Sequence, residues 1–328
     1  MSLLQIRDLT ISFRTAGRPL NVVHNLNLEI EEGETFGLAG ESGCGKSLTA
    51  LSIIGILPHN AFAHGEIIYK GRNLLKLDSE SLRRLRGKEI SMIFQEPMTS
   101  LNPVLTIGDQ VSEVLKTHMS FSKKKALTST IDLLRTVKIP SPEIRIKEYP
   151  HQMSGGMRQR VMIAMAIACN PSLLIADEPT TALDVTIQAQ ILELLRNIKE
   201  QRNMSILLIT HDIGVIAENA YRAGIMYAGR IMEISKVENL LNCPKHPYTI
   251  GLLESMPKGK GIPLKPIPGT VPKPGELPPG CKFSDRCRYM IPDCQKEEPL
   301  LREIIPGQFA RCIRSERISI GNYRCSKY

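Results

Sequence analysis

Short segments with apolar residues at alternate positions open the chain and predict three β-strands, at residues 3–6, 9–13 and 26–30. A turn at Gly33 separates them from an apolar strand at residues 35–39, which runs directly into a glycine-rich loop. Helical character follows over residues 48–57, and Pro58 ends it because proline cannot continue a helix.

Farther along, short apolar strands alternate with segments of helical character. Strands are predicted at residues 65–69, 90–94, 173–176 and 205–210, and helices at residues 157–169 and 187–201. Such alternation predicts an α/β fold with a mainly parallel sheet. Between about residues 107 and 157 the spacing is helical and charges are frequent, which predicts an inserted helical subdomain.

The composition changes after Met256. Residues 257–279 contain eight prolines and four glycines, which is typical of an irregular linker. A basic segment rich in cysteine follows it. The pattern therefore predicts a large domain over residues 1–256 and a linker with a small cysteine-rich region over residues 257–328.

The overall composition is that of a soluble globular protein, with 42% apolar and 23% charged residues. The longest apolar runs, at residues 50–57 and 161–169, fall short of the ~18 residues that a membrane-spanning helix needs. The first residues show no charged segment followed by an apolar signal core, so we expect a cytoplasmic protein.

The positive charge lies at one end of the chain. The net charge is +9, and residues 258–328 alone hold 14 Lys and Arg against 7 Asp and Glu. Such a segment faces nucleic acid, an anionic membrane surface or an anionic cofactor, or it is a solvated basic surface.

The glycine-rich loop fits the phosphate-binding pattern G-x-x-x-x-G-K-[ST]. Its residues are Gly40, Glu41, Ser42, Gly43, Cys44, Gly45, Lys46 and Ser47. The glycines allow backbone N–H groups to point at phosphate oxygens, and the following helix adds its positive N-terminal end. Lys46 is placed to reach the β- and γ-phosphates of a nucleotide, and Ser47 to ligate Mg²⁺. The alternative is an ordinary turn between a strand and a helix.

Two carboxylates end the apolar strand at residues 173–176. Asp177 would reach the Mg²⁺ at the carboxyl end of the sheet, and Glu178 would hold or deprotonate the attacking water. Alone, this pattern is weak, because many strands end in solvated acids. After a phosphate-binding loop it is strong.

Ser154, Gly155 and Gly156 precede a predicted helix. A serine there serves as a helix cap, or it forms a second phosphate cradle with the bare backbone of the glycines. Both interpretations stay open from these three residues alone.

Taken together and in this order, the motifs closely resemble the ATPase subunits of ABC transporters, from the start of the chain to about Met256. The resemblance makes residues 153–157 the signature sequence, with Met157 in place of the usual glutamine, which removes a hydrogen-bonding side chain. It also assigns a Q-loop glutamine, a D-loop at residues 182–184, a switch histidine and an aromatic residue for adenine. These are Gln95, Asp184, His211 and Phe13, although a core phenylalanine is an equal alternative for Phe13.

In this family the signature of one ATPase subunit closes over the nucleotide of another, so the resemblance implies a second ATPase subunit. Residues 95–103, 244–249 and 267–272 look like the oligopeptide, dipeptide and nickel importers. That branch implies a related ATPase in a heterodimer, two integral membrane permease subunits and an extracytoplasmic substrate-binding protein. It places the chain peripherally at the cytoplasmic face of the cell membrane, with peptide as the expected cargo.

Four cysteines near the C-terminus form a candidate metal site. Cys281, Cys287, Cys294 and Cys312 are separated by 5, 6 and 17 residues. Four thiolates can hold a [4Fe–4S] cluster, whereas structural zinc ligands more often lie two to four residues apart. Some dipeptide-importer ATPases resemble this region and carry such a cluster; zinc and unligated thiols are the alternatives. Five flanking basic residues would stabilise an anionic cluster, namely Lys282, Arg286, Arg288, Arg311 and Arg314.

Other functions within the same family are alternatives to peptide import. The same family includes nickel and other small-solute importers, and non-transport ABC ATPases in DNA repair or translation. Repair members would need a long coiled-coil insertion and translation members usually carry two cassettes, so the single cassette favours an importer that binds no nucleic acid.

Overall fold

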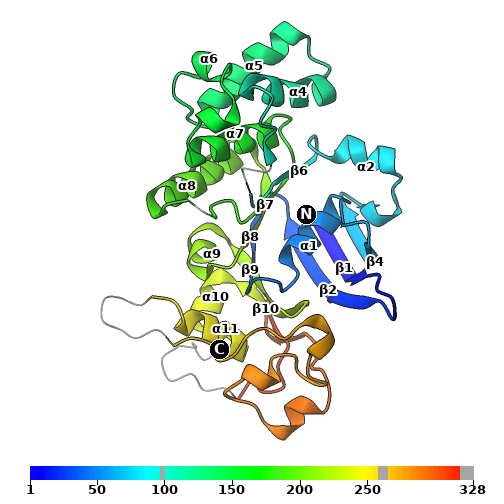
Figure 1. Ribbon diagram of the computed structural model, residues 1–328. Helices are drawn as coiled ribbons and strands as arrows, with labels where there is room; N and C mark the ends of the chain where they lie inside the picture. The colour runs from blue at the N-terminus through cyan, green and yellow to red at the C-terminus, as the bar shows by residue number, and fades with distance from the viewer. Residues whose placement is uncertain (97–99, 182, 258–264, 318–328) are drawn as a thin grey trace. The chain divides into compact units, whose positions relative to one another are not determined.

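A computed structural model describes residues 1–96, 100–181, 183–257 and 265–317. The chain forms two compact units (Figure 1). Unit 1 comprises residues 76–209 together with Met1 and residues 31–34. Unit 2 comprises residues 2–30, 35–75 and 210–328. The glycine-rich loop therefore belongs to unit 2, and the two carboxylates and the signature sequence belong to unit 1.

Unit 1 is built on three parallel strands. In spatial order they are β6 (Ile90–Ile93), β7 (Leu173–Asp177) and β8 (Ser205–Thr210). Every residue of β7 and β8 is buried, as expected for parallel strands covered on both faces. The strands predicted at residues 173–176 and 205–210 are confirmed.

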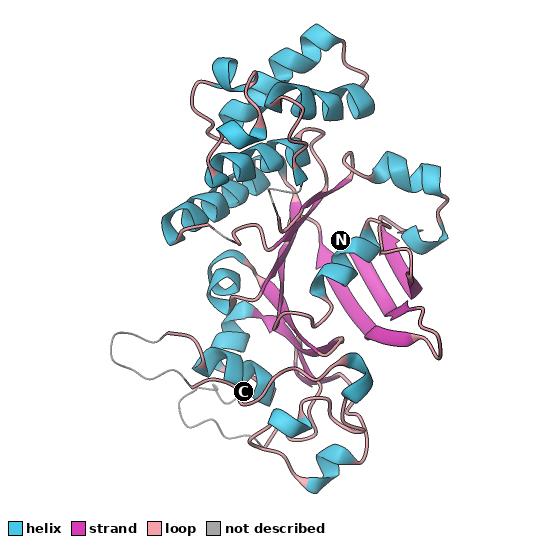
Figure 2. Cartoon of the chain, viewed as in Figure 1, coloured by secondary structure: helices cyan, strands magenta, loops and turns pink. Residues whose placement is uncertain are grey.

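Helices make up the rest of unit 1 (Figure 2). They are α2 (Ser79–Leu85), α4 (Ile107–Met119), α5 (Lys123–Thr136), α6 (Pro142–Arg145), α7 (Gly155–Ile167) and α8 (Val185–Arg202). The helical stretch predicted after residue 107 is confirmed, as three helices. Thr106 and Ser122 begin the first two, because each side chain accepts a hydrogen bond from a backbone N–H three residues on.

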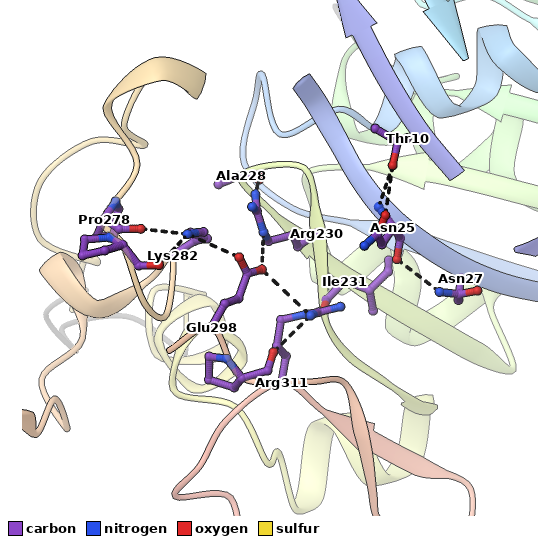
Figure 3. Close-up of polar contacts among 12 residues, drawn as sticks. Thr10, Asn25, Asn27, Ala228, Arg230, Ile231, Pro278, Lys282, Glu298 and Arg311 are labelled. Atoms are coloured by element: carbon purple, nitrogen blue, oxygen red, sulfur yellow. Dashed lines mark hydrogen bonds and ion pairs between the residues drawn. The ribbon is translucent and has the colours of Figure 1, made fainter. Parts of the chain in front are cut away.

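One sheet of unit 2 is antiparallel. Its strand order is β2 (Leu20–Glu31), β1 (Ser2–Phe13), β4 (Ala61–Tyr69) and β5 (Arg72–Asn73). The two strands predicted at residues 3–6 and 9–13 are one strand with a bulge, where Asp8 has a φ of +48°. Two hydrogen bonds between Thr10 and Asn25 join β1 to β2, and Asn27 donates to the Asn25 backbone oxygen within β2 (Figure 3). At this bulge the alternation of apolar and polar residues is interrupted at Arg7 and Asp8, which is why the sequence predicted two strands.

The second sheet of unit 2 carries the glycine-rich loop. Its order is β11 (Arg302–Ile305), β12 (Gln308–Ala310), β10 (Arg230–Lys236), β9 (Arg222–Tyr227) and β3 (Thr35–Ala39). Strand β3 pairs with β9 in parallel, and the remaining pairs are antiparallel. The accompanying helices are α1 (Lys46–Ile53), α9 (Ile213–Asn219), α10 (Val237–Asn242) and α11 (Pro247–Glu254). Among the described residues, no helix has the length and apolar character that crossing a membrane requires.

The C-terminal segment is part of unit 2. Its strand β12 extends the sheet at β10, and its chain, orange to red in Figure 1, lies beside that strand. The Glu298 carboxylate forms ion pairs with Arg230 of β10 and with Lys282 and Arg311 of the segment (Figure 3). The segment therefore docks by strand pairing and by charge, which the pattern of apolar residues does not reveal.

Candidate functional site

Strand β3 delivers the glycine-rich loop to the end of its sheet. Gly40 follows the strand directly, and a Cβ there would lie 2.1 Å from the backbone oxygen of Met226, so no larger residue fits. Gly43 has a φ of +78°, and nothing lies within 4 Å of the position a Cβ would take. Gly43 and Ser42 are exposed, so the loop leaves room for a ligand to approach its backbone.

Lys46 is the first residue of α1, and it lies over the loop. Its side chain is buried, and Nζ donates hydrogen bonds to the backbone oxygens of Gly40 at 2.7 Å and Glu41 at 3.0 Å. A buried ammonium group needs such partners. Ser47 follows it in the first turn of α1, half-buried. The loop thus joins a cation, a hydroxyl and a helix N-terminus, the groups that bind a nucleotide's phosphates and Mg²⁺.

The other half of the predicted site lies in unit 1. Asp177 ends β7 with only 3% of its surface exposed. Glu178 follows with a φ of +46°, and its backbone N–H donates to the oxygen of Ile209 at 2.8 Å. Its Oε2 accepts hydrogen bonds from Gln95 Nε2 at 3.1 Å and from Thr181 Oγ1 at 2.8 Å.

Glu178 and Gln95 lie 83 positions apart in the chain, and the structure brings them together. Thr181 completes this arrangement, and sequence reasoning missed it because a threonine three residues after a carboxylate is an unremarkable pattern. Two donors hold one oxygen of the carboxylate and thereby fix its orientation. An oriented carboxylate can act as a general base toward a water molecule.

Ser154 is a helix cap, as one of the two interpretations predicts. Its Oγ accepts a hydrogen bond from the Met157 N–H at 3.3 Å, and α7 begins at Gly155. Asp184 caps α8 in the same way, with Oδ1 accepting from the Ile187 N–H at 2.9 Å. A Cβ at Gly156 would lie 3.0 Å from the Ile187 side chain, so this glycine lets the two helix starts approach each other.

The remaining predicted residues lie at the ends of two strands. His211 is exposed directly after the last residue of β8, and Phe13 is a half-buried residue at the end of β1. Ala182, residues 97–99 and Cys325 lie outside the described residues.

The four predicted cysteine ligands line one small cavity. Cys281, Cys287, Cys294 and Cys312 surround it together with the buried rings of His246 and Phe283. All four are free thiols. Burial raises the pKa of Cys281 to about 12 and that of Cys287 to about 11. Among the described residues, no group of three or more His, Cys, Asp or Glu side chains is arranged to hold a metal ion.

Three of the basic residues beside the cysteines have partners that the sequence did not indicate. Lys282 pairs with Glu298, Arg288 with Glu254 at 2.5 Å, and Arg286 with Glu41 of the phosphate-binding loop at 2.7 Å. These ion pairs are the contacts that the structure shows for the three residues, and stabilisation of an anionic cluster by the five basic residues stays a prediction. The Arg286 and Arg288 pairs attach the cysteine-rich region to the rest of unit 2, and the Lys282 pair lies within the region.

Comparison with known proteins gives two family matches. Residues 23–181 match the model described as ABC transporter. Residues 232–294 match the model described as oligopeptide/dipeptide transporter, C-terminal region.

Similar proteins cover nearly the whole chain. A probable peptide ABC transporter ATP-binding protein, y4tR of Sinorhizobium fredii, is 49% identical over 96% of this chain and 96% of its own length. The dipeptide transport ATP-binding protein DppD of Bacillus subtilis is 48% identical over 94% of this chain and 91% of its own. Among solved structures, the dimeric ATP-binding cassette MJ0796 bound to ADP and Pi is 27% identical, with a TM-score of 0.64 over 71% of this chain and 98% of that one.

Proposed function

Since this chain belongs to the ABC transporter family, with the C-terminal region of its oligopeptide and dipeptide transporters, we propose that it is the ATP-hydrolysing subunit of a peptide importer. The observation that carries the proposal is the combination of a phosphate-binding loop closed by Lys46 with a fixed carboxylate at Glu178. Relatives named for peptide and dipeptide transport favour peptide over nickel as cargo. Residues 1–256 would form the ATPase domain and residues 257–328 its C-terminal region.

In this proposal the loop residues 40–47 bind the phosphates of ATP. Lys46 would contact the β- and γ-phosphates, and Phe13 would stack on adenine. Ser47, Gln95 and Asp177 would hold Mg²⁺, which neutralises the charge that develops on the phosphates. The hydroxyl, amide and carboxylate oxygens of these side chains are the donors that Mg²⁺ prefers.

Glu178 would act as the general base on the attacking water. Gln95 and Thr181 donate to its Oε2 and hold the carboxylate in one orientation, in which it would accept a proton from that water. His211 would contact the γ-phosphate, which would make it, with Glu178 and Gln95, part of the catalytic set.

The signature residues Ser154, Gly155 and Gly156, with Asp184, would serve the nucleotide of a second ATPase subunit. The solved relative with a TM-score of 0.64 is a dimer, which supports this assembly. We propose a related second ATPase, two permease subunits in the membrane and an extracytoplasmic binding protein as partners. The chain would sit peripherally at the cytoplasmic face.

The four cysteines would hold a [4Fe–4S] cluster. They surround one cavity, which a shared ligand would occupy. A single zinc ion, which would need all four sulfurs at about 2.3 Å from one point, is the alternative. A cluster separates its thiolates, because iron and sulfide fill the space between them.

Two variants test the ATPase assignment, each assembled with its partner subunits. Lys46→Ala should weaken nucleotide binding, because the loop loses its cation. Glu178→Gln should retain binding but lower turnover by about 100-fold or more, because an amide cannot accept the proton. Glu193→Gln on the exposed face of α8 is the control and should behave as the wild type. Near-normal turnover by Glu178→Gln would refute the assigned base.

A further inference from the structure

Arg286 connects the cysteine-rich region to the phosphate-binding loop. It ends a short 3₁₀ turn over Ser284–Arg286, immediately before Cys287. Its guanidinium group donates two parallel hydrogen bonds to the Glu41 carboxylate, from Nη1 to Oε2 at 2.7 Å and from Nη2 to Oε1 at 3.0 Å. The arginine side chain is 5% exposed and that of Glu41 is 30% exposed. A bidentate pair of this kind is among the stronger and more directional polar contacts in proteins.

The rest of the guanidinium group is also fixed. Its Nε donates to the backbone oxygen of Pro268 at 2.8 Å, and its carbon lies 5.6 Å from the centre of the Tyr227 ring. Tyr227 packs against Tyr248 and Phe283, with ring centres 4.8 and 5.3 Å away. Phe283 in turn lines the cysteine cavity. One packed cluster therefore joins the cysteines, Arg286 and the aromatic rings.

Glu41 is held by its backbone as well. Its N–H donates to Tyr248 Oη at 3.0 Å, and its backbone oxygen accepts from Lys46 Nζ at 3.0 Å. Moving Glu41 therefore moves an acceptor of the lysine that closes the loop. The conformation of residues 40–46 therefore depends on the backbone and on the side chain of Glu41. Arg286 fixes the side chain.

We propose that Arg286 is a positioning residue for the phosphate-binding loop. Through Arg286, the binding of a ligand by the four cysteines is coupled to the affinity of the loop for nucleotide. The inference rests on the proposed nucleotide role of the loop. A ligand that holds the four thiols together keeps the segment ending at Arg286 in place. By linkage, a nucleotide that fixes the loop must stabilise the cysteine site by the same factor.

Arg288 provides the matched control. It lies on the other side of Cys287 and forms a bidentate pair of the same kind, but with Glu254 of α11. Removing either pair weakens the attachment of the cysteine-rich region. Only the Arg286 pair ends in the phosphate-binding loop, so only its loss should alter nucleotide binding specifically.

The first experiment measures the Kd of a fluorescent ATP analogue for the full chain as wild type, Arg286→Gln and Arg288→Gln. Arg286→Gln should raise the Kd by about tenfold, a typical coupling factor between two sites. Arg288→Gln should leave it within about twofold. Equal Kd values for wild type and Arg286→Gln, or equal losses in both variants, would overturn the proposal. A wild type that binds no nucleotide would instead refute the proposed function.

Arg286→Lys covers the case in which Arg286→Gln does not fold. Lysine keeps the charge but not the two parallel donors, so the Kd should lie between those of the wild type and the glutamine variant. A lysine variant with wild-type affinity would show that the charge alone suffices, and the positioning role would be lost.

The reciprocal experiment follows the thiols rather than the nucleotide. Iodoacetamide modification of Cys287, the least buried of the four, is timed by mass spectrometry with and without a non-hydrolysable ATP analogue. The analogue should slow modification by about tenfold in the wild type and in Arg288→Gln, and not in Arg286→Gln. An analogue that binds the wild type without changing the rate would contradict the coupling.

Discussion

Two regions of unit 2 are stabilised by different interactions. The sheet around β3, β9 and β10 is held by backbone ladders and by side chains with almost no exposed surface, such as Phe36 and Met226. The region over residues 265–317 has two short strands and 3₁₀ turns of three or four residues. It is joined to the rest of unit 2 by the pairing of β12 with β10 and by ion pairs, and four buried or half-buried thiols lie within it.

The difference suggests a division of labour. Apolar packing is not screened by salt as ion pairs are, and it does not depend on redox conditions, so the sheet presents the phosphate-binding loop in one conformation. Ion pairs are weakened by salt, and thiols respond to redox conditions. Salt and redox conditions should therefore alter this region first. Through Arg286 the change would reach the phosphate-binding loop.

The largest effect should come from the apolar sheet. Phe36→Ala removes a fully buried ring from β3 and leaves a cavity, which should cost about 4 kcal/mol of unfolding free energy. Urea unfolding at low and high salt should give the same loss at both. A loss that depends strongly on salt would break the contrast between the regions.

Glu298→Ala should cost about 3 kcal/mol, because Arg230, Lys282 and Arg311 are then left facing one another with little exposure. Added salt should recover part of this loss, since it screens the repulsion among the three cations. The neighbouring exposed Glu297→Ala is the control and should change stability little. Equal losses in both variants would show that the ion pairs do not hold the region.

Glu233→Gln tests a carboxylate that serves both regions, and should cost about 2 kcal/mol. Glu233 is fully buried in β10 and accepts hydrogen bonds from the backbone N–H groups of Lys245 and His246 and from Gln308 Nε2 of β12. An amide would turn a donor toward one of these donors. Thermal unfolding measures the loss, and an unchanged Tm would mean that the site tolerates an amide.

A further effect depends on pH. Burial, and secondarily the charge of Arg230, lowers the pKa of His24 to about 4. As the pH falls, His24 therefore becomes protonated in the unfolded chain before it does in the folded chain. The stability that neutral, buried His24 contributes is present above pH 6.5 and is lost as the pH falls toward 4. His24→Gln should flatten this part of the stability–pH curve in urea titrations. The same slope in both proteins would contradict the assignment.

The pattern of apolar residues along the chain predicts those helices and strands that are stabilised by apolar packing. The strands at residues 173–177 and 205–210 were predictable because whole strands are buried, and the phosphate-binding loop because its glycines meet backbone requirements that few residues satisfy. The family resemblance named Gln95 and Glu178 as site residues, but the hydrogen bond between them was not predicted. Spacing alone could not supply it.

Long-range charge pairing escapes such analysis. Arg286 and Glu41 are separated by 245 positions, and nothing in either local sequence selects the other. For the same reason the docking of residues 265–317 through Glu298, and the extension of the sheet by β12, were not predicted. Polar contacts of this kind depend on the finished fold.

ATP hydrolysis that drives peptide import is the activity proposed for this chain. Its most direct test is the rate of ATP hydrolysis by the transporter reconstituted in nanodiscs, with and without peptide-loaded binding protein. The wild-type assembly should hydrolyse ATP faster when the loaded binding protein is added, and the assembly with Glu178→Gln should stay about 100-fold slower or more in both conditions. A wild-type rate that ignores the binding protein, or a Glu178→Gln assembly as fast as the wild type, would contradict the claim.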